Sequence, residues 1–452
     1  MAAVAPGTVV TTRIDALGYG GAGIGRHGSR MLRVPKALPG ELVRAEVVRD
    51  RGRRLDAALL EVLEPAAERV QAPCAHFARC GGCTLMHLSP VQQREDKFAK
   101  LRERLVRAFG HSVAALLRPV VPSPTDVRFR NRSAFVVRNG DLGMVDPARR
   151  TLAPVDTCLV AEPAVDALLV RMQEWLSGVG RGNAALVHGV MFRTGTTHDM
   201  AILTVDPAVG LPTEPAALAP LVPGWLAELA QALGTASVWA CTRAADDRSL
   251  LGRGLVHLHG PLRIQQSLGP FTLDLSPTSF AQSNPGLAAR LYADVVASLA
   301  LQPQERVLDL FSGSGGLGLH LGAAGNPVHG VELDRFAAAD ATASALAHGM
   351  AHVRFLAGKA ERAADKLWRR QQRFDVATLN PPRSGMPRDL APRLAPLGIR
   401  RVALVSCSPA TLVNDLAALQ SNGYRATAIT PYDMFPHTSH LETHVALERA
   451  AT

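Results

Sequence analysis

The chain has 452 residues, of which 47% are hydrophobic, and it carries a formal net charge of +10. A chain of this length can form two to four domains, each with its own core. No stretch of about 20 apolar residues lacks charge, so no membrane span is expected. The segment "MAAVAPGTVV" has no basic region of the kind that signal peptides carry. We therefore expect a cytoplasmic protein whose thiols are reduced.

The positive charge is concentrated in the first third of the chain. Residues 1–160 contain 25 basic and 15 acidic residues, whereas residues 161–452 contain 24 of each. The runs "RDRGRR" and "RFRNR" lie in the basic part. A basic front part joined to a neutral body favours binding to a polyanion such as nucleic acid. The alternative is that the arginines only keep the protein soluble.

The pattern of residues along the chain predicts three parts. Residues 7–65 read as short strands broken by glycine, which is typical of a small barrel. A cysteine-rich segment (71–90) and an amphipathic basic helix (91–110) follow, and residues 118–275 mix strand-like runs with an apolar helix around 162–178. From residue 285, helices alternate with apolar strands, which predicts an α/β, doubly wound, Rossmann-like sheet. We expect a β-barrel at 1–68, a central α+β domain at 69–275 and the doubly wound domain at 276–452.

A nucleotide site is predicted at the segment "VLDLFSGSGGLGLHL" (307–321). It combines a buried strand, a glycine-rich turn and a helix start, where free N–H groups gather and the backbone can approach a ligand. Glu332 ends the next strand, 23 residues after Asp309, and an acid at that spacing can bind ribose hydroxyls. The alternative for Glu332 is an exposed loop acid. Asn380 ends a later strand before two prolines that stiffen the turn. The turn resembles the first motif of class I S-adenosylmethionine methyltransferases.

Cys407 follows the apolar run "VALVS" at a Ser-Cys-Ser-Pro turn. A lone cysteine is more often a small buried hydrophobe than a nucleophile. Beside a sulfonium cofactor, however, a thiolate could add to C6 of a uracil and make C5 nucleophilic enough to take the methyl group. A base must then remove the C5 proton. Glu442 in "HLETHVALER" is the candidate base, and the alternatives are a surface acid or a salt-bridge partner.

Five segments in order carry a resemblance to a known family: "SPTSFAQSNP", "DLFSGSGGLGLHL", "NPPRSG", "VSCSPATLVNDL" and "DMFPHTSHLETHVAL". Together they resemble the motif set of the RNA uracil-C5 (5-methyluridine) methyltransferase family. The resemblance implies that Cys407 is the nucleophile and that Glu442 is the base. It implies S-adenosyl-L-methionine as the methyl donor, with cofactor-binding positions at Gln282, Phe311, Glu332 and Asn380.

Three positions depart from the usual pattern of the family. Many members have Asp where this chain has Asn380, and Asn where it has Gly316. Both variants resemble a subgroup that methylates a 23S rRNA hairpin loop. Ser408 replaces the usual Asn beside the thiol and bears on how the turn is oriented. We expect a monomeric enzyme acting on structured RNA, with rRNA favoured and tRNA as the alternative.

Three of the six cysteines lie within ten positions of one another. In a cytosolic chain such clustering indicates metal binding or catalysis. A fourth ligand must come from elsewhere, and by ligand chemistry alone four thiolates suit zinc or an iron–sulfur cluster. The family resemblance favours a [4Fe–4S] cluster with a structural or RNA-binding role, whereas Cys241 reads as a core thiol. The expected ligands are Cys74, Cys80, Cys83 and Cys158.

The barrel segment "GYGGAGIGRHGSRMLRVPKALPGE" resembles a TRAM domain, a small RNA-binding module. The segment "FRNR" (129–132) resembles a family segment near the RNA, although surface salt bridges are the alternative. Because a target uracil must leave its stack, a single-stranded loop is the least costly substrate. The side chains expected to contact phosphates are Arg26, Arg30, Arg33 and Lys36, together with Arg130 and Arg132.

Two rival functions make different predictions. Cytosine-C5 methylation shares the thiol chemistry but needs an acid that protonates N3. An RNA-binding protein with a decayed catalytic site would bind no S-adenosylmethionine. The presence of all five motifs argues against the second rival.

Overall fold

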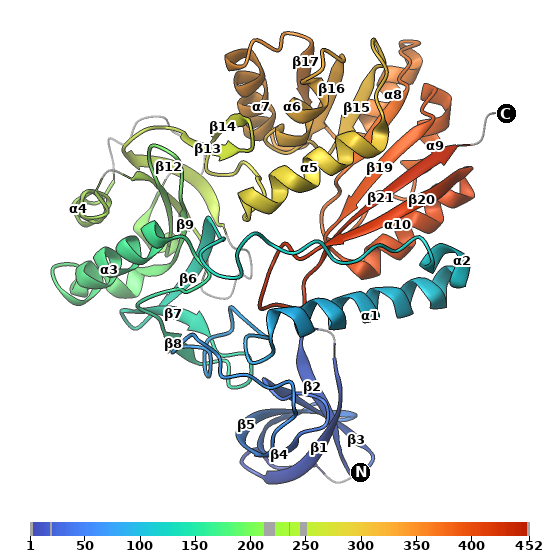
Figure 1. Cartoon of the computed structure of the whole chain (residues 1–452). Helices are drawn as coiled ribbons and strands as arrows, with labels where there is room; N and C mark the ends of the chain where they lie inside the picture. The colour runs from blue at the N-terminus through green and yellow to red at the C-terminus, as the bar shows by residue number, and fades with distance from the viewer. Residues whose placement is uncertain (1–2, 19, 212–221, 235, 245–250, 450–452) are drawn as a thin grey trace.

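The computed structural model describes residues 3–18, 20–211, 222–234, 236–244 and 251–449. It contains a small barrel, a central sheet and a C-terminal sheet, with one long helix running between the barrel and the C-terminal sheet (Figure 1). Within the described ranges, no helix is long and apolar enough to cross a membrane.

The first five strands close into a barrel in the order β1-β2-β3-β5-β4. Inward residues such as Val10, Ile14, Leu32 and Val43 alternate with exposed ones and fill its interior. Closure removes the open strand edges that a five-stranded sheet would otherwise expose. The strands are β1 (Val9–Leu17), β2 (Ala22–His27), β3 (Arg30–Pro35), β4 (Leu42–Asp50) and β5 (Arg54–Glu64).

The cysteine segment that follows has no regular secondary structure and leads into α1 (Pro90–Phe109) and the short α2 (His111–Ala114). Ser89 caps α1, because its hydroxyl accepts a hydrogen bond from the Gln92 N–H. The apolar face of α1 packs against the C-terminal domain through Leu101 and Leu105. The chain after α2 then runs beside β20, with backbone bridges from Leu117 and Val121. Helix α1 is therefore part of the core of the C-terminal domain, although the central sheet lies between it and that domain in the chain.

The central sheet has seven strands in the order β12-β11-β10-β9-β6-β7-β8. One face is covered by α3 (Pro163–Ser177) and α4 (Gly224–Ala232). Alternate residues of the same strands, including Met191, Met200 and Ile202, face the core shared with the C-terminal domain. The strands are β6 (Arg132–Arg138), β7 (Asp141–Val145), β8 (Leu152–Pro154), β9 (Val187–Arg193), β10 (Met200–Val205), β11 (Ser237–Thr242) and β12 (Arg253–His259).

A two-stranded hairpin, β13 (Ile264–Leu268) and β14 (Phe271–Leu275), connects the central sheet to α5 (Pro285–Leu299). The C-terminal sheet then has the order β17-β16-β15-β18-β19-β21-β20. Its strands are β15 (Val307–Leu310), β16 (Val328–Glu332), β17 (Val353–Ala357), β18 (Val376–Leu379), β19 (Arg401–Ser406), β20 (Tyr424–Tyr432) and β21 (Glu442–Arg449). Its helices are α6 (Gly316–Gly322), α7 (Arg335–Ala347), α8 (Ala360–Arg369), α9 (Ala391–Leu394) and α10 (Pro409–Ser421).

Both faces of the C-terminal sheet are covered by helices, so its central strands are buried on both faces. Neighbouring residues such as Val307 and Leu308 point into different cores. Helices α5, α6 and α7 cover one face, and α1, α8, α9 and α10 cover the other.

The predicted fold class is confirmed, with a barrel, an α+β centre and a doubly wound domain in that order. The sheet is not wholly parallel, because β21 runs antiparallel to both β19 and β20. This antiparallel pair brings the end of the chain back to the site at the carboxyl ends of β18 and β19.

Candidate active site

Cys407 lies in the turn between β19 and α10, at the carboxyl edge of the sheet. Ser408 is the N-cap of α10, where its hydroxyl accepts a hydrogen bond from the Thr411 N–H at 3.4 Å. Its own N–H donates to the Ser406 hydroxyl. The Ser408 side chain is thus occupied by the helix cap, which holds the turn that presents the thiol.

Glu442 is the first residue of β21 and faces this turn. The antiparallel register pairs Ser406 with Thr443, so Cys407, which follows Ser406, lies opposite Glu442, which precedes Thr443. The Glu442 side chain is only 1% exposed. Burial raises the pKa of this carboxyl to about 8, and the nearby Arg383 opposes the shift.

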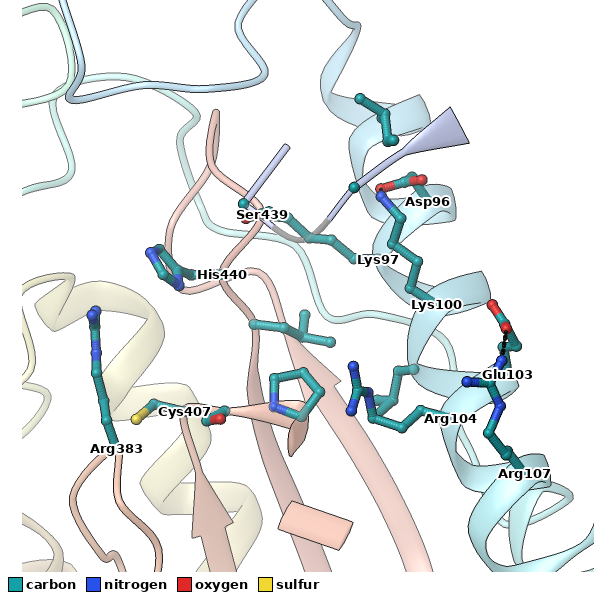
Figure 2. A pocket seen from close by; sticks show the side chains of 17 residues that line it. Asp96, Lys97, Lys100, Glu103, Arg104, Arg107, Arg383, Cys407, Ser439 and His440 are labelled. Carbon is teal, nitrogen blue, oxygen red and sulfur yellow. Dashed lines mark hydrogen bonds and ion pairs between the residues drawn. The ribbon is translucent and has the colours of Figure 1, made fainter. Parts of the chain in front are cut away.

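Arg383 comes from the Asn-Pro-Pro-Arg loop after β18 and lies beside the thiol (Figure 2). Burial and the Glu442 charge raise the pKa of the Cys407 thiol, whereas the charge of Arg383 and a hydrogen bond from its side chain lower that pKa. A guanidinium between a thiol and a carboxyl favours the ionised form of both. Three strand ends therefore bring a thiol, a carboxyl and a guanidinium together.

A cleft of about 430 Å³ opens onto Cys407. Figure 2 shows Arg383, Cys407 and His440 on one side and the polar side chains of α1 on the other. Leu17 and Gly18 of the barrel complete the rim. A volume in this range holds a small planar group with room to spare. The cleft is formed jointly by the barrel, α1 and the C-terminal domain.

A second, narrow cleft lies on the other side of the glycine turn. It is lined by three of the four predicted cofactor residues, Gln282, Phe311 and Asn380, with Gln266 and Tyr292 on the opposite wall. Its volume of about 20 Å³ holds little more than one water molecule. Side chains must therefore move apart before a molecule of nucleotide size can enter.

Glu332, the fourth predicted cofactor residue, supports the glycine turn. One carboxylate oxygen accepts the Gly313 N–H at 2.9 Å and the other accepts the Asp334 N–H at 2.8 Å. These bonds fix its carboxylate at the end of β16. The turn itself holds Gly313 at a φ of +55° and Phe311 at +61°, in the left-handed region.

Two glycines of the turn also have a packing role. A Cβ at Gly315 would lie 2.7 Å from the Ala341 Cβ, and one at Gly316 would lie 2.6 Å from Leu268. These glycines allow α6 to pack closely against α7 and the β13–β14 hairpin, and Gly316 also lines the narrow cleft. Gly316 is therefore constrained by its protein neighbours.

Comparison with known proteins agrees with this geometry. A family model described as tRNA (Uracil-5-)-methyltransferase matches residues 231–450, and a TRAM domain model matches residues 3–60. The 23S rRNA (uracil(1939)-C(5))-methyltransferase RlmD of Alkalilimnicola ehrlichii is 33% identical over 446 residues, covering 97% of this chain and 96% of the relative. The chain belongs to the RNA uracil-C5 methyltransferase family.

Two further comparisons extend over the whole length of this methyltransferase. An uncharacterized RNA methyltransferase of Caldanaerobacter subterraneus subsp. tengcongensis is 29% identical, covering 96% of this chain and 97% of that protein. The crystal structure of the Pyrococcus abyssi tRNA (uracil-54, C5)-methyltransferase in complex with S-adenosyl-L-homocysteine covers 97% of this chain and 100% of its own, with a TM-score of 0.73 and 23% identity. The second likeness establishes the shared fold. Membership of the family makes this chain an RNA methyltransferase that uses S-adenosylmethionine.

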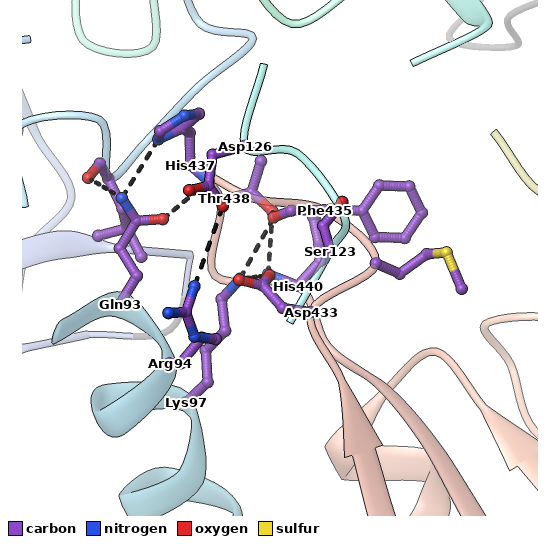
Figure 3. A network of polar contacts seen from close by, with 12 residues as sticks. Gln93, Arg94, Lys97, Ser123, Asp126, Asp433, Phe435, His437, Thr438 and His440 are labelled. Atoms are coloured by element: carbon purple, nitrogen blue, oxygen red, sulfur yellow. Dashed lines mark hydrogen bonds and ion pairs between the residues drawn. The ribbon is translucent and has the colours of Figure 1, made fainter. Parts of the chain in front are cut away.

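The loop that leads into Glu442 is clamped by α1 and the cysteine segment (Figure 3). The Lys97 ammonium donates to the Asp433 carboxylate at 2.5 Å and to the Phe435 carbonyl at 3.2 Å. Gln93 accepts the His437 N–H at 2.8 Å, and the His437 carbonyl accepts the N–H groups of residues 84 and 85. Because Lys97 and Asp433 are almost fully buried, this ion pair is shielded from water.

The four predicted cluster cysteines lie near one another. Cys74, Cys83 and Cys158 pack on one small apolar cluster. Burial raises the pKa of the Cys83 thiol, and the charges of the other three thiolates raise it further. The nearby cations Lys36 and Arg130 oppose the shifts of Cys80 and Cys83 respectively. Neighbouring thiols with nearby cations fit a thiolate-bound group. Nevertheless, no three His, Cys, Asp or Glu side chains of the described residues are already arranged to hold a metal ion. The ligand set stays a prediction, and Cys241 is a fully buried core thiol.

Two of the four basic barrel residues are not available to RNA phosphates. Arg30 is 7% exposed and pairs with Asp50, and Lys36 is 8% exposed and donates to the Phe77 and Cys80 carbonyls. The prediction of phosphate contacts is wrong for both, because each charge is used to tie segments of the protein together. Arg26 is exposed and Arg33 is half-buried.

Arg130 and Arg132 are half-buried and make no ion pair among the described residues. Arg130 lies over the Phe435 ring and donates to the Arg132 carbonyl, and Arg132 donates to the Met191 sulfur at 2.9 Å. Among the described residues, surface salt bridges, the alternative considered for Arg130 and Arg132, are therefore absent at these two residues, whereas the adjacent Arg128 pairs with Asp166.

Sequence reasoning assigned no role to Arg383, His440 or the cleft-lining face of α1. Arg383 is visible in the sequence as the residue directly after the Asn-Pro-Pro turn, but its contact with the thiol is not. The charges on α1 alternate in sign at i, i+4 spacing, as in Asp96 with Lys100 and Glu103 with Arg107. That pattern does not indicate which face lies over the site.

Proposed function

We propose that this methyltransferase methylates C5 of a uridine through a covalent adduct with Cys407. The observation that carries the proposal is the arrangement of Cys407 opposite Glu442, with Arg383 beside both and the glycine-turn cleft next to them. These are the groups that the reaction requires, at the edge of the sheet where doubly wound folds bind ligands.

We propose the following order of bond formation and cleavage. The Cys407 thiolate adds to C6 of the uracil, and the electron pair moves to C5. C5 then takes the methyl group from the sulfonium, which leaves as S-adenosylhomocysteine. Ionised Glu442 accepts the C5 proton, the pair of that C–H bond restores the C5–C6 double bond, and the C6–S bond breaks to return the thiolate.

The surroundings of each group suit its role. Arg383 favours the thiolate form of Cys407. Burial of Glu442 raises its pKa to about 8, so that once ionised it is a stronger base than an exposed carboxylate. The burial of Glu442 also keeps water away from the proposed base.

We place S-adenosylmethionine in the glycine-turn cleft. Glu332, which accepts the Gly313 N–H at the cleft, would bind the ribose hydroxyls, Phe311 would pack on the adenosine, and Asn380 lies on the side nearest β19 and the thiol. Gln282, 5% exposed, lines the same cleft. When bound, the cofactor supplies the methyl group, and these residues orient it and exclude water.

The RNA that we favour is 23S rRNA, because a relative named for that substrate aligns over nearly the whole chain. The alternative is tRNA, which is named both in the matching family model and in the name of the Pyrococcus abyssi enzyme. A cleft bounded by the barrel and α1 suits a base that has been flipped out of a single-stranded loop. The two substrates are separated by methylating each RNA in purified, unmodified form.

We also propose three functional parts: an RNA-binding barrel at 1–68, a central domain at 69–275 and a methyltransferase domain at 276–452. In the central domain Cys74, Cys80, Cys83 and Cys158 would hold a [4Fe–4S] cluster with a structural role. Anaerobic purification followed by iron and sulfide analysis tests this assignment. A Cys83→Ser variant should lose iron, and equal iron in both proteins would refute it.

The nucleophile is tested with labelled S-adenosylmethionine and RNA that lacks the modification. Cys407→Ala should abolish labelling, whereas Cys241→Ala, which removes a buried thiol far along the chain, should retain it. Equal 5-methyluridine from wild type and Cys407→Ala would overturn the proposal. RNA containing 5-fluorouridine, which has no C5 proton, should trap an adduct with the wild type only. Supplying cytosine and uracil in the same loop distinguishes the cytosine alternative.

A further inference from the structure

One strand near the cofactor cleft carries a polar residue where its pattern calls for an apolar one. In β13, Ile264, Gln266 and Leu268 face inward, and Gln265 and Ser267 face outward. Gln266 is 4% exposed and pairs across the hairpin with Leu273, which is also buried. An inward position between Ile264 and Leu268 is one that a leucine or valine would ordinarily fill.

The amide of Gln266 makes no hydrogen bond. Neither its oxygen nor its nitrogen has a partner among the described residues, although both atoms are shielded from solvent. Buried amides are almost always hydrogen-bonded, because leaving one unpaired costs free energy. The neighbouring Gln265, by contrast, is exposed and donates to Asp274 at 3.3 Å.

Gln266 lines the glycine-turn cleft, on the wall formed by the β13–β14 hairpin and α5. Leu268, Leu273 and Tyr292 of the same wall would all lie within 3.5 Å of a Cβ placed at Gly316, so this wall closes over the start of α6. Around the cleft, the unpaired amide is thus set among apolar side chains and faces the space that a ligand would enter.

The strand order indicates which part of the cofactor reaches this wall. A sulfonium has three arms. In the placement proposed above, the ribose arm would point to Glu332 at the end of β16, and the methyl group would point past Asn380, which follows β18, toward Cys407, which follows β19. The remaining arm carries the α-amino and α-carboxylate groups. In that placement it would extend away from the sheet edge, toward the hairpin wall.

We propose that Gln266 binds the amino-acid end of S-adenosylmethionine. An amide offers a donor group, its NH₂, and an acceptor atom, its oxygen, which match a carboxylate and an ammonium group on the same carbon. Gln266 would donate to the carboxylate from Nε2 and accept from the ammonium at Oε1. The inference rests on the cofactor cleft assigned under the proposed function.

The test compares two adenosine ligands by isothermal titration calorimetry with the full-length protein. S-adenosylhomocysteine contains the amino-acid arm, and 5′-deoxy-5′-methylthioadenosine lacks it. Gln266→Leu should weaken S-adenosylhomocysteine about ten- to hundredfold, because it removes hydrogen bonds to charged groups, and should leave methylthioadenosine unchanged. Gln265→Leu is the matched control and should change neither affinity. Gln266→Glu keeps the shape but repels the carboxylate, so it should show the same selective loss.

Each outcome separates this inference from the cleft assignment. Glu332→Ala removes the ribose partner and should weaken both ligands. If Glu332→Ala weakens both and Gln266→Leu weakens neither, the cleft is correct and the role of Gln266 is overturned. Equal weakening of both ligands by Gln266→Leu and Gln266→Glu would also overturn it, since a general packing defect is then the cause. If neither the Glu332 nor the Gln266 variants matter, the cleft assignment fails as well.

Discussion

Glu442 should destabilise the folded protein as the pH rises, and Gln in its place should remove that effect. Burial raises the pKa of the carboxyl from 4.5 to about 8, so the folded state keeps the proton while the unfolded chain loses it. Stability therefore falls as pH rises from 4.5 to 8 and then levels off. The shift corresponds to about 5 kcal/mol in full, of which about 3 kcal/mol is already lost at pH 7.

The measurement is urea denaturation of wild type and Glu442→Gln at a series of pH values from 5 to 9. Because Gln cannot ionise, the variant should gain on the wild type by up to about 1.4 kcal/mol per pH unit in that window. The groups facing Glu442 are Cys407, Arg383 and Tyr292; all three are kept in the variant, although the pKa values of the Cys407 thiol and the Tyr292 hydroxyl lose the upward contribution of the Glu442 charge. Glu448→Gln, on the exposed end of the same strand, is the control and should follow the wild type.

Glu442→Gln should also block release of the methylated RNA, after the methyl group has been transferred. Without a base for the C5 proton, Glu442→Gln should form a covalent RNA adduct that resolves slowly, visible as a protein–RNA band in denaturing gels. Parallel pH–stability curves for wild type and Glu442→Gln would refute the burial argument. Fast release of 5-methyluridine by the variant would refute its role as the base.

Three further predictions concern the active site and the buried Lys97–Asp433 ion pair. Arg383→Met should lower kcat/KM by about tenfold or more at pH 7 and shift the pH–rate profile to higher pH, because the Cys407 thiol loses the cation that favours its ionisation. A profile that stays at the same pH contradicts this. Lys97→Met leaves Asp433 buried without its partner and should cost about 3–5 kcal/mol of stability, part of which Asp433→Leu restores in the double variant; an undiminished melting temperature contradicts this. Ser408→Ala should cost about 1 kcal/mol through the lost helix cap, whereas Ser408→Asn should be neutral in stability and activity; loss of activity in the Asn variant would show that Ser408 does more than cap.

Among the strands that the sequence indicated, those of the C-terminal sheet have helices on both faces. "RVLDLF" and "RVALVS" are mostly apolar because β15 and β19 contribute alternate residues to two cores. The β13–β14 hairpin was not predicted, since glutamines at 265 and 266 interrupt the apolar pattern. The interruption is informative, because Gln266 points inward all the same and its amide remains unpaired among the described residues.

The sequence pointed to the residues of the proposed site where one motif carries one reactive side chain, and their catalytic roles stay predictions. Cys407 and Glu442 belong to separate motifs, and only the antiparallel register of β19 and β21 places them opposite each other. Charge was less informative. Lys36 looks like a phosphate ligand in the sequence, but its amine is buried against the cysteine segment. A positive charge in a pattern does not distinguish a solvent-facing cation from one that joins two segments.

The helix α1 illustrates this limit most clearly. Its sequence predicts an amphipathic basic helix, and the helix forms over the expected residues. Its buried Lys97, however, pairs with Asp433, which is 336 positions away in the chain. The buried pair holds the loop before Glu442, and Gln93 binds the same loop at His437. Helix α1 therefore both lines the cleft and holds the loop before Glu442, so a change on its buried face should alter catalysis without touching a residue of the proposed reaction.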